Sequence, residues 1–128
     1  MSIDATGIHH ITLRVTDLER SGAFFRGVLG FDVQTPDPEL SLFQVGDTIV
    51  ALRPPLDGTA PGDRFSEYRI GVDHLAFAVP DRAQLERGVE ALRAADVATE
   101  GIETDPLLGK EYVCFRDPDN VQWELYST

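Results

Sequence analysis

The chain repeats one pattern of residues, and this internal repeat restricts its possible folds more than any other feature. The first copy, Gly7-Ile8-His9-His10-Ile11-x-x-x-Val15-x-Asp17, returns 64 residues later as Gly71-Val72-Asp73-His74-Leu75-x-x-x-Val79-x-Asp81. One copy alone buries too little apolar surface to be stable, because it offers a thin sheet with a single helix. The repeat therefore predicts two similar modules that pack together or pair with another chain.

Each copy is expected to have the order βαβββ, which gives an α+β fold. Residues 8–15 alternate in polarity, which is typical of a strand, and Thr16 with Glu19 forms a capping box that opens a helix. Gly30 is expected to end that helix. In the second copy Asp81 with Gln84 opens the helix. The strands are expected at 8–15, 31–35, 40–45 and 48–53, and then at 72–79, 97–102, 111–116 and 121–126.

Length and composition indicate one domain covering residues 1–128. Its two modules are expected at about 7–53 and 71–127, joined by the proline- and glycine-rich connector 54–70. A chain of 128 residues with 42% hydrophobic residues suits one compact domain. A formal net charge of −11 argues against nucleic acid and anionic membranes as partners. The single cysteine and the lack of a signal-peptide pattern lead us to expect a cytoplasmic protein.

The repeat also indicates candidate metal ligands. His10 and His74 occupy equivalent positions, and imidazole is the commonest protein ligand for transition metals. The last strands of the two modules align so that Ala51 takes the place of Glu124, whose strand neighbours are apolar. Two histidines and one carboxylate form a facial triad that leaves positions open for substrate, which suits Fe(II), Mn(II) or Zn(II). The sequence therefore predicts one divalent metal per site, of unspecified identity.

Other residues near these candidates have both structural and functional interpretations. His9 is expected to point away from His10 and to be structural or at the surface, since Asp73 takes its place in the second copy. Tyr112 and Cys114 share a strand face and are predicted to line a pocket near Glu124, although Cys114 also suits a small core residue. Arg53 either binds an anionic substrate or ends a solvated strand. Trp123, Phe24 and Phe25 are expected in the core.

The chain resembles the vicinal oxygen chelate superfamily, the glyoxalase, bleomycin resistance and extradiol dioxygenase group, over nearly all of residues 7–127. The motifs that carry the resemblance are His10-Ile11-Thr12-Leu13-Arg14-Val15-x-Asp17-Leu18-Glu19-Arg20, Phe24-Phe25, Leu29-Gly30-Phe31, Asp73-His74-Leu75-Ala76-Phe77 and Phe115-Arg116-Asp117-Pro118-Asp119-Asn120-Val121-Gln122-Trp123-Glu124. The resemblance implies paired βαβββ modules that form a cupped mixed sheet around a divalent metal. It implies His10, His74 and Glu124 as metal ligands.

Departures from the family pattern reduce the number of activities expected for this chain. Glyoxalase I enzymes carry a second glutamate where this chain has Ala51, which counts against lactoylglutathione lyase activity. Thr12 matches a threonine kept by fosfomycin-modifying members, but their phosphonate-binding residues are not recognisable between 104 and 114. Members of this size are commonly homodimers, in which His10 of one subunit shares a site with His74 and Glu124 of the other.

Three functional hypotheses follow. The first is a metal-dependent enzyme, a lyase, isomerase or ring-cleaving dioxygenase, that chelates a small oxygenated substrate; Glu124 is its catalytic residue, and substrate contacts are expected from Thr12, Arg53, Tyr112, Cys114 and Tyr126. The second is a bleomycin-resistance-like protein that sequesters an apolar or cationic small molecule without turnover. The third is a structural subunit with a vestigial site. All three ligand residues are present, which weighs against pure sequestration.

Overall fold

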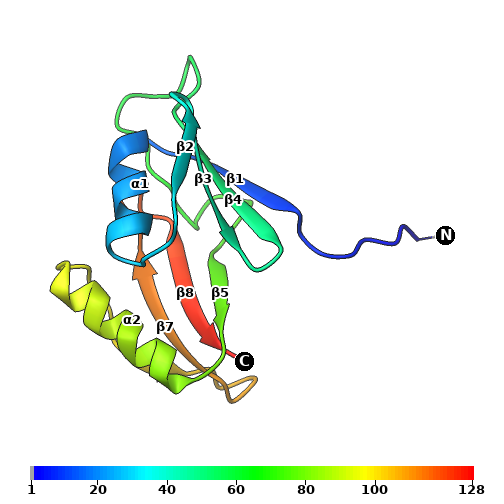
Figure 1. Ribbon diagram of the computed structural model, residues 1–128, viewed down its shortest axis with the longest axis vertical. Helices are drawn as coiled ribbons and strands as arrows, with labels where there is room; N and C mark the ends of the chain where they lie inside the picture. Colours follow the sequence, from blue (N-terminus) through cyan, green and yellow to red (C-terminus); the bar gives the residue numbers. More distant parts are fainter. Residues whose placement is uncertain (1) are drawn as a thin grey trace.

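The computed structural model describes residues 2–128, which form two four-stranded mixed sheets with one helix each (Figure 1). In the first module, strands β1 (His10–Arg14), β2 (Gln34–Asp37), β3 (Leu40–Val45) and β4 (Thr48–Arg53) follow the order β1-β4-β3-β2. In the second, strands β5 (Leu75–Val79), β6 (Ile102–Thr104), β7 (Glu111–Arg116) and β8 (Gln122–Ser127) follow the order β5-β8-β7-β6. Helices α1 (Leu18–Gly27) and α2 (Arg82–Ala94) follow the first strand of each module. The predicted α+β fold of paired βαβββ modules is confirmed.

The internal repeat extends to strand register. The first strand of each module runs parallel to the last, with Thr12 opposite Ala51 in one module and Ala76 opposite Glu124 in the other. The glycines that precede these strands, Gly7 and Gly71, have nearly the same backbone angle, with φ of +149° and +141°. Residues with a side chain rarely adopt such angles, so both modules need glycine at this point. The sequence alignment of Ala51 with Glu124 therefore describes real structural equivalence.

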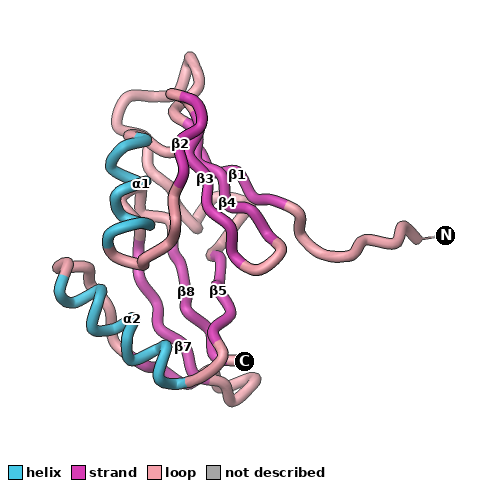
Figure 2. Tube along the Cα trace, viewed as in Figure 1, coloured by secondary structure: helices cyan, strands magenta, loops and turns pink. Residues whose placement is uncertain are grey.

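One hydrophobic core joins the two modules. Phe25 of α1 is fully buried and meets Trp123 of β8 with ring centroids 5.5 Å apart. The ring of Phe31 packs against Phe43 of its own module and Phe77 of the other, with ring centroids 4.7 Å and 5.0 Å apart. Both helices lie on the same side of the sheets, and the chain between them crosses from one module to the other (Figure 2). The core positions predicted for Phe24, Phe25 and Trp123 are confirmed.

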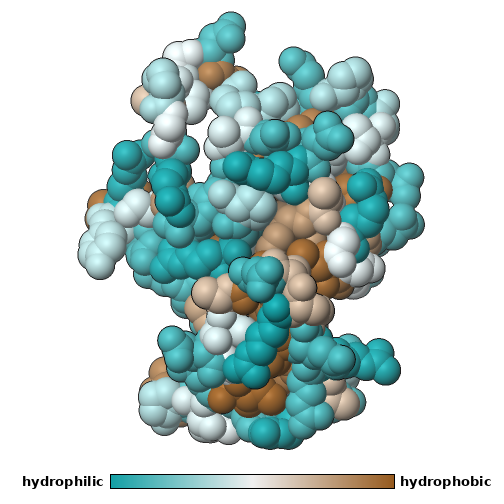
Figure 3. All heavy atoms as spheres, turned by 90° about the vertical axis from the view of Figure 1, so that its left-hand side faces the viewer, coloured by the Kyte–Doolittle hydropathy of each residue, from teal (hydrophilic) through white to brown (hydrophobic). Residues whose placement is uncertain are grey.

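The packing of the helices leaves an apolar groove between the modules. Viewed from the helix side, apolar side chains gather where the upper and lower halves of the molecule meet (Figure 3). The groove encloses about 340 Å³ and is lined by residues of both modules, including Leu29, Phe31, Phe77 and Leu125. The modules thus contact each other through their helix-bearing sides, and the opposite face of each sheet stays open.

Several local predictions need correction. The strands expected at 8–15 and 72–79 are shorter and span His10–Arg14 and Leu75–Val79. Asp17, not Thr16, caps α1, because its carboxylate accepts from the Arg20 amide while the Thr16 hydroxyl donates to Asp119. The strand expected at 31–35 begins only at Gln34, since Phe31 turns into the core. The strand expected at 97–102 begins only at Ile102, after α2 has ended with Asp96 in the left-handed region.

The second helix matches its prediction more closely. The Asp81 carboxylate accepts from the Gln84 amide, as expected of an N-cap. The apolar positions Leu85 and Leu92 are fully buried, and Val89 packs against the same core. None of the helices within residues 2–128 has the length and apolar character needed to cross a lipid bilayer.

Candidate functional site

His74 and Glu124 form the core of the candidate site. His74 directly precedes β5, and Glu124 lies on the neighbouring strand β8 opposite Ala76. The Nε2 atom of His74 lies 3.6 Å from the Glu124 Oε1 atom, and 39% and 12% of the two side chains are exposed. The Nδ1 atom of His74 lies 2.7 Å from the Asp73 Oδ1 atom. An ionised carboxylate only accepts hydrogen bonds, so Asp73 favours the tautomer with a proton on Nδ1 and a lone pair on Nε2.

This pair lies in an open recess of about 400 Å³ on the side of the second sheet that bears no helix. The residues that line it are His74, Ala76, Asp105, Pro106, Leu108, Tyr112, Glu124 and Tyr126. The register places Cys114 opposite Glu124 and Tyr112 opposite Tyr126. Tyr112 and Tyr126 line the recess, as predicted for Tyr112, whereas Cys114 lies opposite Glu124 but is not among the lining residues.

Burial controls the protonation of the recess. It raises the pKa of the Glu124 carboxyl above its ordinary value; His74 lowers it, and Asp105 and Glu103 raise it further. Burial likewise raises the pKa of the Cys114 thiol, and the charge on Glu124 adds to this shift. At neutral pH the thiol therefore stays protonated and is a poor nucleophile.

The two tyrosines are phenols rather than phenolates at neutral pH. Burial raises the pKa of both Tyr112 and Tyr126, and a hydrogen bond to Asp105 contributes for Tyr126. The Tyr126 hydroxyl donates to Asp105 Oδ2 across 2.9 Å. Hydrogen bonds from the Leu107 amide and from Tyr126 hold the pKa of Asp105 below its usual value. The tyrosines can donate or accept hydrogen bonds, but neither is suited to act as a base.

His10, Thr12 and Arg53 lie on the first sheet, apart from the recess. His10 and Thr12 are exposed and share one face of β1, with Thr12 opposite the buried Ala51. Arg53 is half-buried at the end of β4, opposite Arg14. Within residues 2–128, no three His, Cys, Asp or Glu side chains lie close enough together to hold one metal ion. A single chain thus brings together two of the three predicted ligands.

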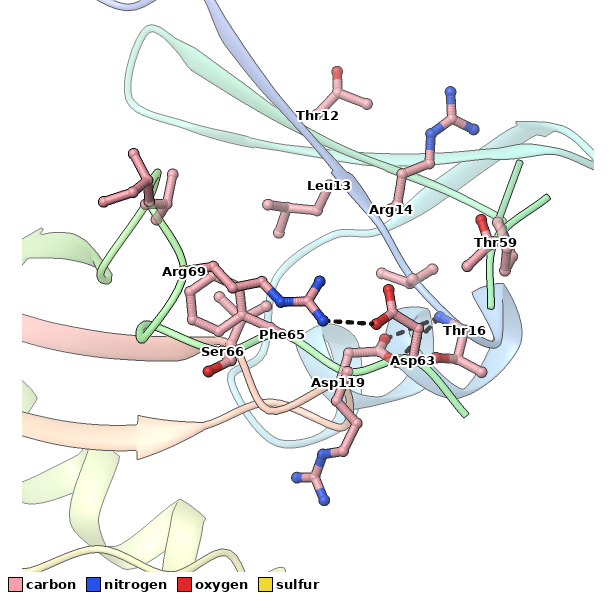
Figure 4. Close-up of a pocket in the computed structure, with 16 residues that line it drawn as sticks. Thr12, Leu13, Arg14, Thr16, Thr59, Asp63, Phe65, Ser66, Arg69 and Asp119 are labelled. Atoms are coloured by element: carbon pink, nitrogen blue, oxygen red, sulfur yellow. Dashed lines mark hydrogen bonds and ion pairs between the residues drawn. The ribbon is translucent and has the colours of Figure 1, made fainter. Parts of the chain in front are cut away.

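A separate pocket of about 420 Å³ lies between β1 and the connector (Figure 4). Leu13 and Phe65 line it, and Arg69 forms an ion pair with Asp63 at 3.8 Å. On one side Asp119 accepts hydrogen bonds from the backbone and hydroxyl of Thr16. Of the predicted site residues, only Thr12 borders this pocket. The hydrogen bonds between Thr16 and Asp119 join the two modules beside this pocket.

Both β1 and β5 are the terminal strands of their sheets. In the described part of the chain, neither has a hydrogen-bonded neighbour on its outer side. Large apolar residues near their beginnings are exposed, with 63% for Ile8, 105% for Ile70 and 50% for Val72. Open strand edges with apolar surroundings favour pairing with another chain.

Sequence reasoning missed two groups of residues. His9 was expected to point away from His10, yet their Nδ1 atoms lie 2.9 Å apart. Because β1 begins at His10, the alternation of a regular strand does not extend to His9. Glu67 of the connector binds Arg116 through two hydrogen bonds of 2.8 and 3.0 Å, which fastens the connector to β7. The repeated spacing of positions 9 and 73 was the available signal for the first pair.

Comparison with known proteins places these features in context. Residues 7–125 match the sequence model of the Glyoxalase/Bleomycin resistance protein/Dioxygenase superfamily. YwkD of Bacillus subtilis is 35% identical, covering 94% of this chain and 95% of YwkD. The metallothiol transferase FosB of Staphylococcus haemolyticus is 29% identical, covering 94% and 83%. A glyoxylase/bleomycin resistance protein/dioxygenase domain from Frankia sp. EAN1pec superimposes with a TM-score of 0.82 at 28% identity, covering 97% of this chain and 98% of that domain.

Proposed function

Since the chain belongs to the Glyoxalase/Bleomycin resistance protein/Dioxygenase superfamily, we propose that it is a divalent-metal-dependent enzyme acting on a small oxygenated substrate. The proposed ligands are His74 and Glu124 of one chain and His10 of a second copy. One observation carries the proposal: the Nε2 atom of His74 faces the Glu124 carboxylate while Nδ1 is engaged by Asp73. The similarity to a metallothiol transferase also supports metal-dependent chemistry.

The geometry of this pair suits a bound metal. With a proton on Nδ1 alone, His74 presents a lone pair to a carboxylate oxygen 3.6 Å away. The repulsion between the two lone pairs is relieved by a proton on Nε2 or by a metal ion bound to both atoms. Two donors bonded to one ion at about 2.1 Å lie roughly 3.0–3.6 Å apart, depending on the angle between them. The donor types, imidazole and carboxylate, are those preferred by Fe(II), Mn(II) and Zn(II).

The third donor requires a second chain. His10 is exposed on β1, and both β1 and β5 present open strand edges. If β1 of one chain lies beside β5 of its partner and runs parallel to it, His10 comes to the same end of the joined sheet as His74, because the two residues lie at the beginnings of equivalent strands. A two-fold symmetric dimer would then hold two identical sites.

Each chain would supply different parts of the site. A bound metal would act as a Lewis acid on neighbouring substrate oxygens. Glu124, the carboxylate beside His74 in the recess, would take up and return a proton of the substrate. Tyr126 donates its own proton to Asp105, so its oxygen is available to accept from a substrate hydroxyl. Thr12 and Arg53 of the other chain would bind polar or anionic parts of the substrate.

Subunit mixing tests the shared site directly. Neither His10→Ala nor His74→Ala alone should retain a complete ligand set. When the two variants are refolded together in equal amounts, half of the dimers contain one chain of each kind. One of the two sites in such a dimer keeps His10, His74 and Glu124, so roughly a quarter of all sites should bind metal. The measurement is metal per chain by elemental analysis, with wild-type protein refolded alongside as the control.

The alternatives predict other results. Sites made within one chain would give no recovery on mixing, because every chain would carry a broken site. Wild-type protein that binds no metal after reloading with iron, manganese or zinc would refute the metal-dependent enzyme. It would favour the sequestering protein, for which His10→Ala and Glu124→Ala should leave ligand affinity intact.

A further inference from the structure

The rings of His9 and His10 contact each other through a specific pair of atoms. Their Nδ1 atoms lie 2.9 Å apart, and the ring planes are nearly perpendicular, at 88°. A hydrogen bond between two such nitrogens requires that one ring carries a proton on Nδ1 and the other presents a lone pair there. The contact therefore leaves two arrangements for neutral rings, in which either His9 or His10 carries its proton on Nδ1 and the other presents a lone pair there.

The second module has the same contact at the equivalent place. Asp73 corresponds to His9 in the repeat, and its Oδ1 atom lies 2.7 Å from the Nδ1 atom of His74. In both modules, then, the residue before the proposed ligand reaches the Nδ1 atom of that ligand. Since an aspartate oxygen and a histidine Nδ1 are the same number of bonds from the backbone, either residue type can fill this place.

The backbone holds His9 in position although it precedes β1. The His9 carbonyl accepts from the Ile49 amide at 3.0 Å, and the Ile8 carbonyl accepts from the Thr48 hydroxyl at 2.7 Å. Both donors lie at the beginning of β4. Gly7, with its φ of +149°, directly precedes this fastened segment. His9 is thus part of the fixed frame of the sheet.

We propose that His9 is a positioning residue for His10. It accepts a hydrogen bond from His10 Nδ1, which leaves the Nε2 lone pair of His10 free for a metal, as Asp73 does for His74. The opposite direction of the hydrogen bond would require the His10 proton on Nε2, which would block that atom as a ligand. This inference rests on the proposed metal site. It assigns a role to His9, which is not one of the proposed metal ligands.

Asp73 should hold the tautomer of His74 more strongly than His9 holds that of His10. A carboxylate is a stronger acceptor than a neutral imidazole, because hydrogen bonds to charged groups are the stronger ones. Loss of an outer partner of a metal-bound histidine typically weakens metal affinity about 10- to 100-fold. We expect about 10-fold weaker zinc binding for His9→Phe, which keeps a ring of similar size but has no acceptor. We expect a larger loss for Asp73→Ala.

The deciding measurement is made without metal. The chain has three histidines, so long-range nitrogen–proton NMR of labelled protein gives three ring patterns, which single histidine substitutions assign. At about pH 9, where imidazole side chains in water are neutral, His10 should carry its proton on Nδ1. In His9→Phe it should revert to the Nε2 form that prevails in free histidine, and His9→Asn, whose side-chain oxygen replaces the acceptor, should restore the Nδ1 form.

A proton on Nε2 of His10 in the wild type, or the same tautomer in wild type and His9→Phe, would overturn the proposal. Zinc competition titrations give the second readout, with His9→Asn near wild-type affinity and His9→Phe weaker. Equal affinity of wild type and His9→Phe would also count against it. If wild-type protein binds no zinc, the proposed function fails, and the tautomer measurement still decides the role of His9.

Discussion

Removal of the Asp119 carboxylate should destabilise the protein more than removal of the exposed Asp17 carboxylate, which caps α1. Asp119 lies in the turn before β8, is 7% exposed, and reaches across to the start of α1 in the other module. It accepts from the Thr16 amide at 3.1 Å and from the Thr16 hydroxyl, and Ser21 donates at 3.4 Å. Arg20 adds an ion pair at 3.4 Å.

The size of the effect follows from these contacts. Two good hydrogen bonds to a charged group contribute about 1.5–3 kcal/mol each. The Ser21 contact is long, and the Arg20 side chain is 49% exposed, so the ion pair adds no more than about 1 kcal/mol. Because neighbouring contributions are not additive, we expect Asp119→Ala to lower the free energy of unfolding by about 3–5 kcal/mol.

Asp17→Ala is the matched control. It also removes an aspartate side chain that binds the beginning of α1, but Asp17 is exposed and caps the helix through one hydrogen bond to the Arg20 amide. Loss of such a cap costs about 0.5–2 kcal/mol. Urea unfolding at fixed protein concentration, followed by fluorescence of the single tryptophan, which is buried at position 123, measures both variants.

A cost for Asp119→Ala no larger than that for Asp17→Ala would refute the reasoning. A double-mutant cycle with Thr16→Val, which removes only the hydroxyl, gives a further check. We expect a coupling energy between Thr16 and Asp119 of about 1–2 kcal/mol, within the range for directly contacting residues.

Two further predictions concern pH and thiol reactivity. The hydrogen bonds from Arg116 lower the pKa of Glu67 from 4.5 to about 2, so the contribution of Glu67 to stability is fully present above pH 4.5 and is lost as pH falls through about 2. The difference in unfolding free energy between wild type and Glu67→Gln should therefore shrink between these two pH values. A difference that stays constant from pH 6 to pH 2 would contradict the assignment. Burial and the Glu124 charge raise the pKa of Cys114. Alkylation of Cys114 by iodoacetamide at pH 7.5 should therefore be slower than alkylation of free cysteine, and it should be faster in Glu124→Gln than in the wild type. An unchanged rate in Glu124→Gln would exclude the effect of the charge.

The repeat made most of the fold predictable. Strand periodicity and the spacing of the two copies predicted the element order, and the alignment of Ala51 with Glu124 proved correct in strand register. The errors arose where distant contacts override local patterns. Thr16 fits a capping box locally, but Asp119, 103 residues away, takes its hydroxyl. Phe31 fits a strand, but packing between the modules draws it into the core.

The candidate site could be predicted only in part, for a physical reason. His74 and Glu124 lie on adjacent strands of one sheet, so sequence pattern was enough to bring them together. His10 lies on the other sheet, and in the proposed site its neighbours would come from a second chain, whose position a sequence pattern does not give. His9 escaped prediction because the alternation rule assumes a regular strand, and the strand begins one residue later.

The difference between Ala51 and Glu124 bears on which modules pair. Two first modules facing each other would offer two histidines and no carboxylate at these positions, a weak site for a hard cation. Two second modules would offer two histidines and two glutamates, enough ligands to close a tetrahedral site. A first module facing a second offers two histidines and one carboxylate, which holds a metal and leaves positions open for substrate. The divergence of the two copies therefore favours a site built from unlike modules, and the open edges of β1 and β5 are the edges through which two chains would form it.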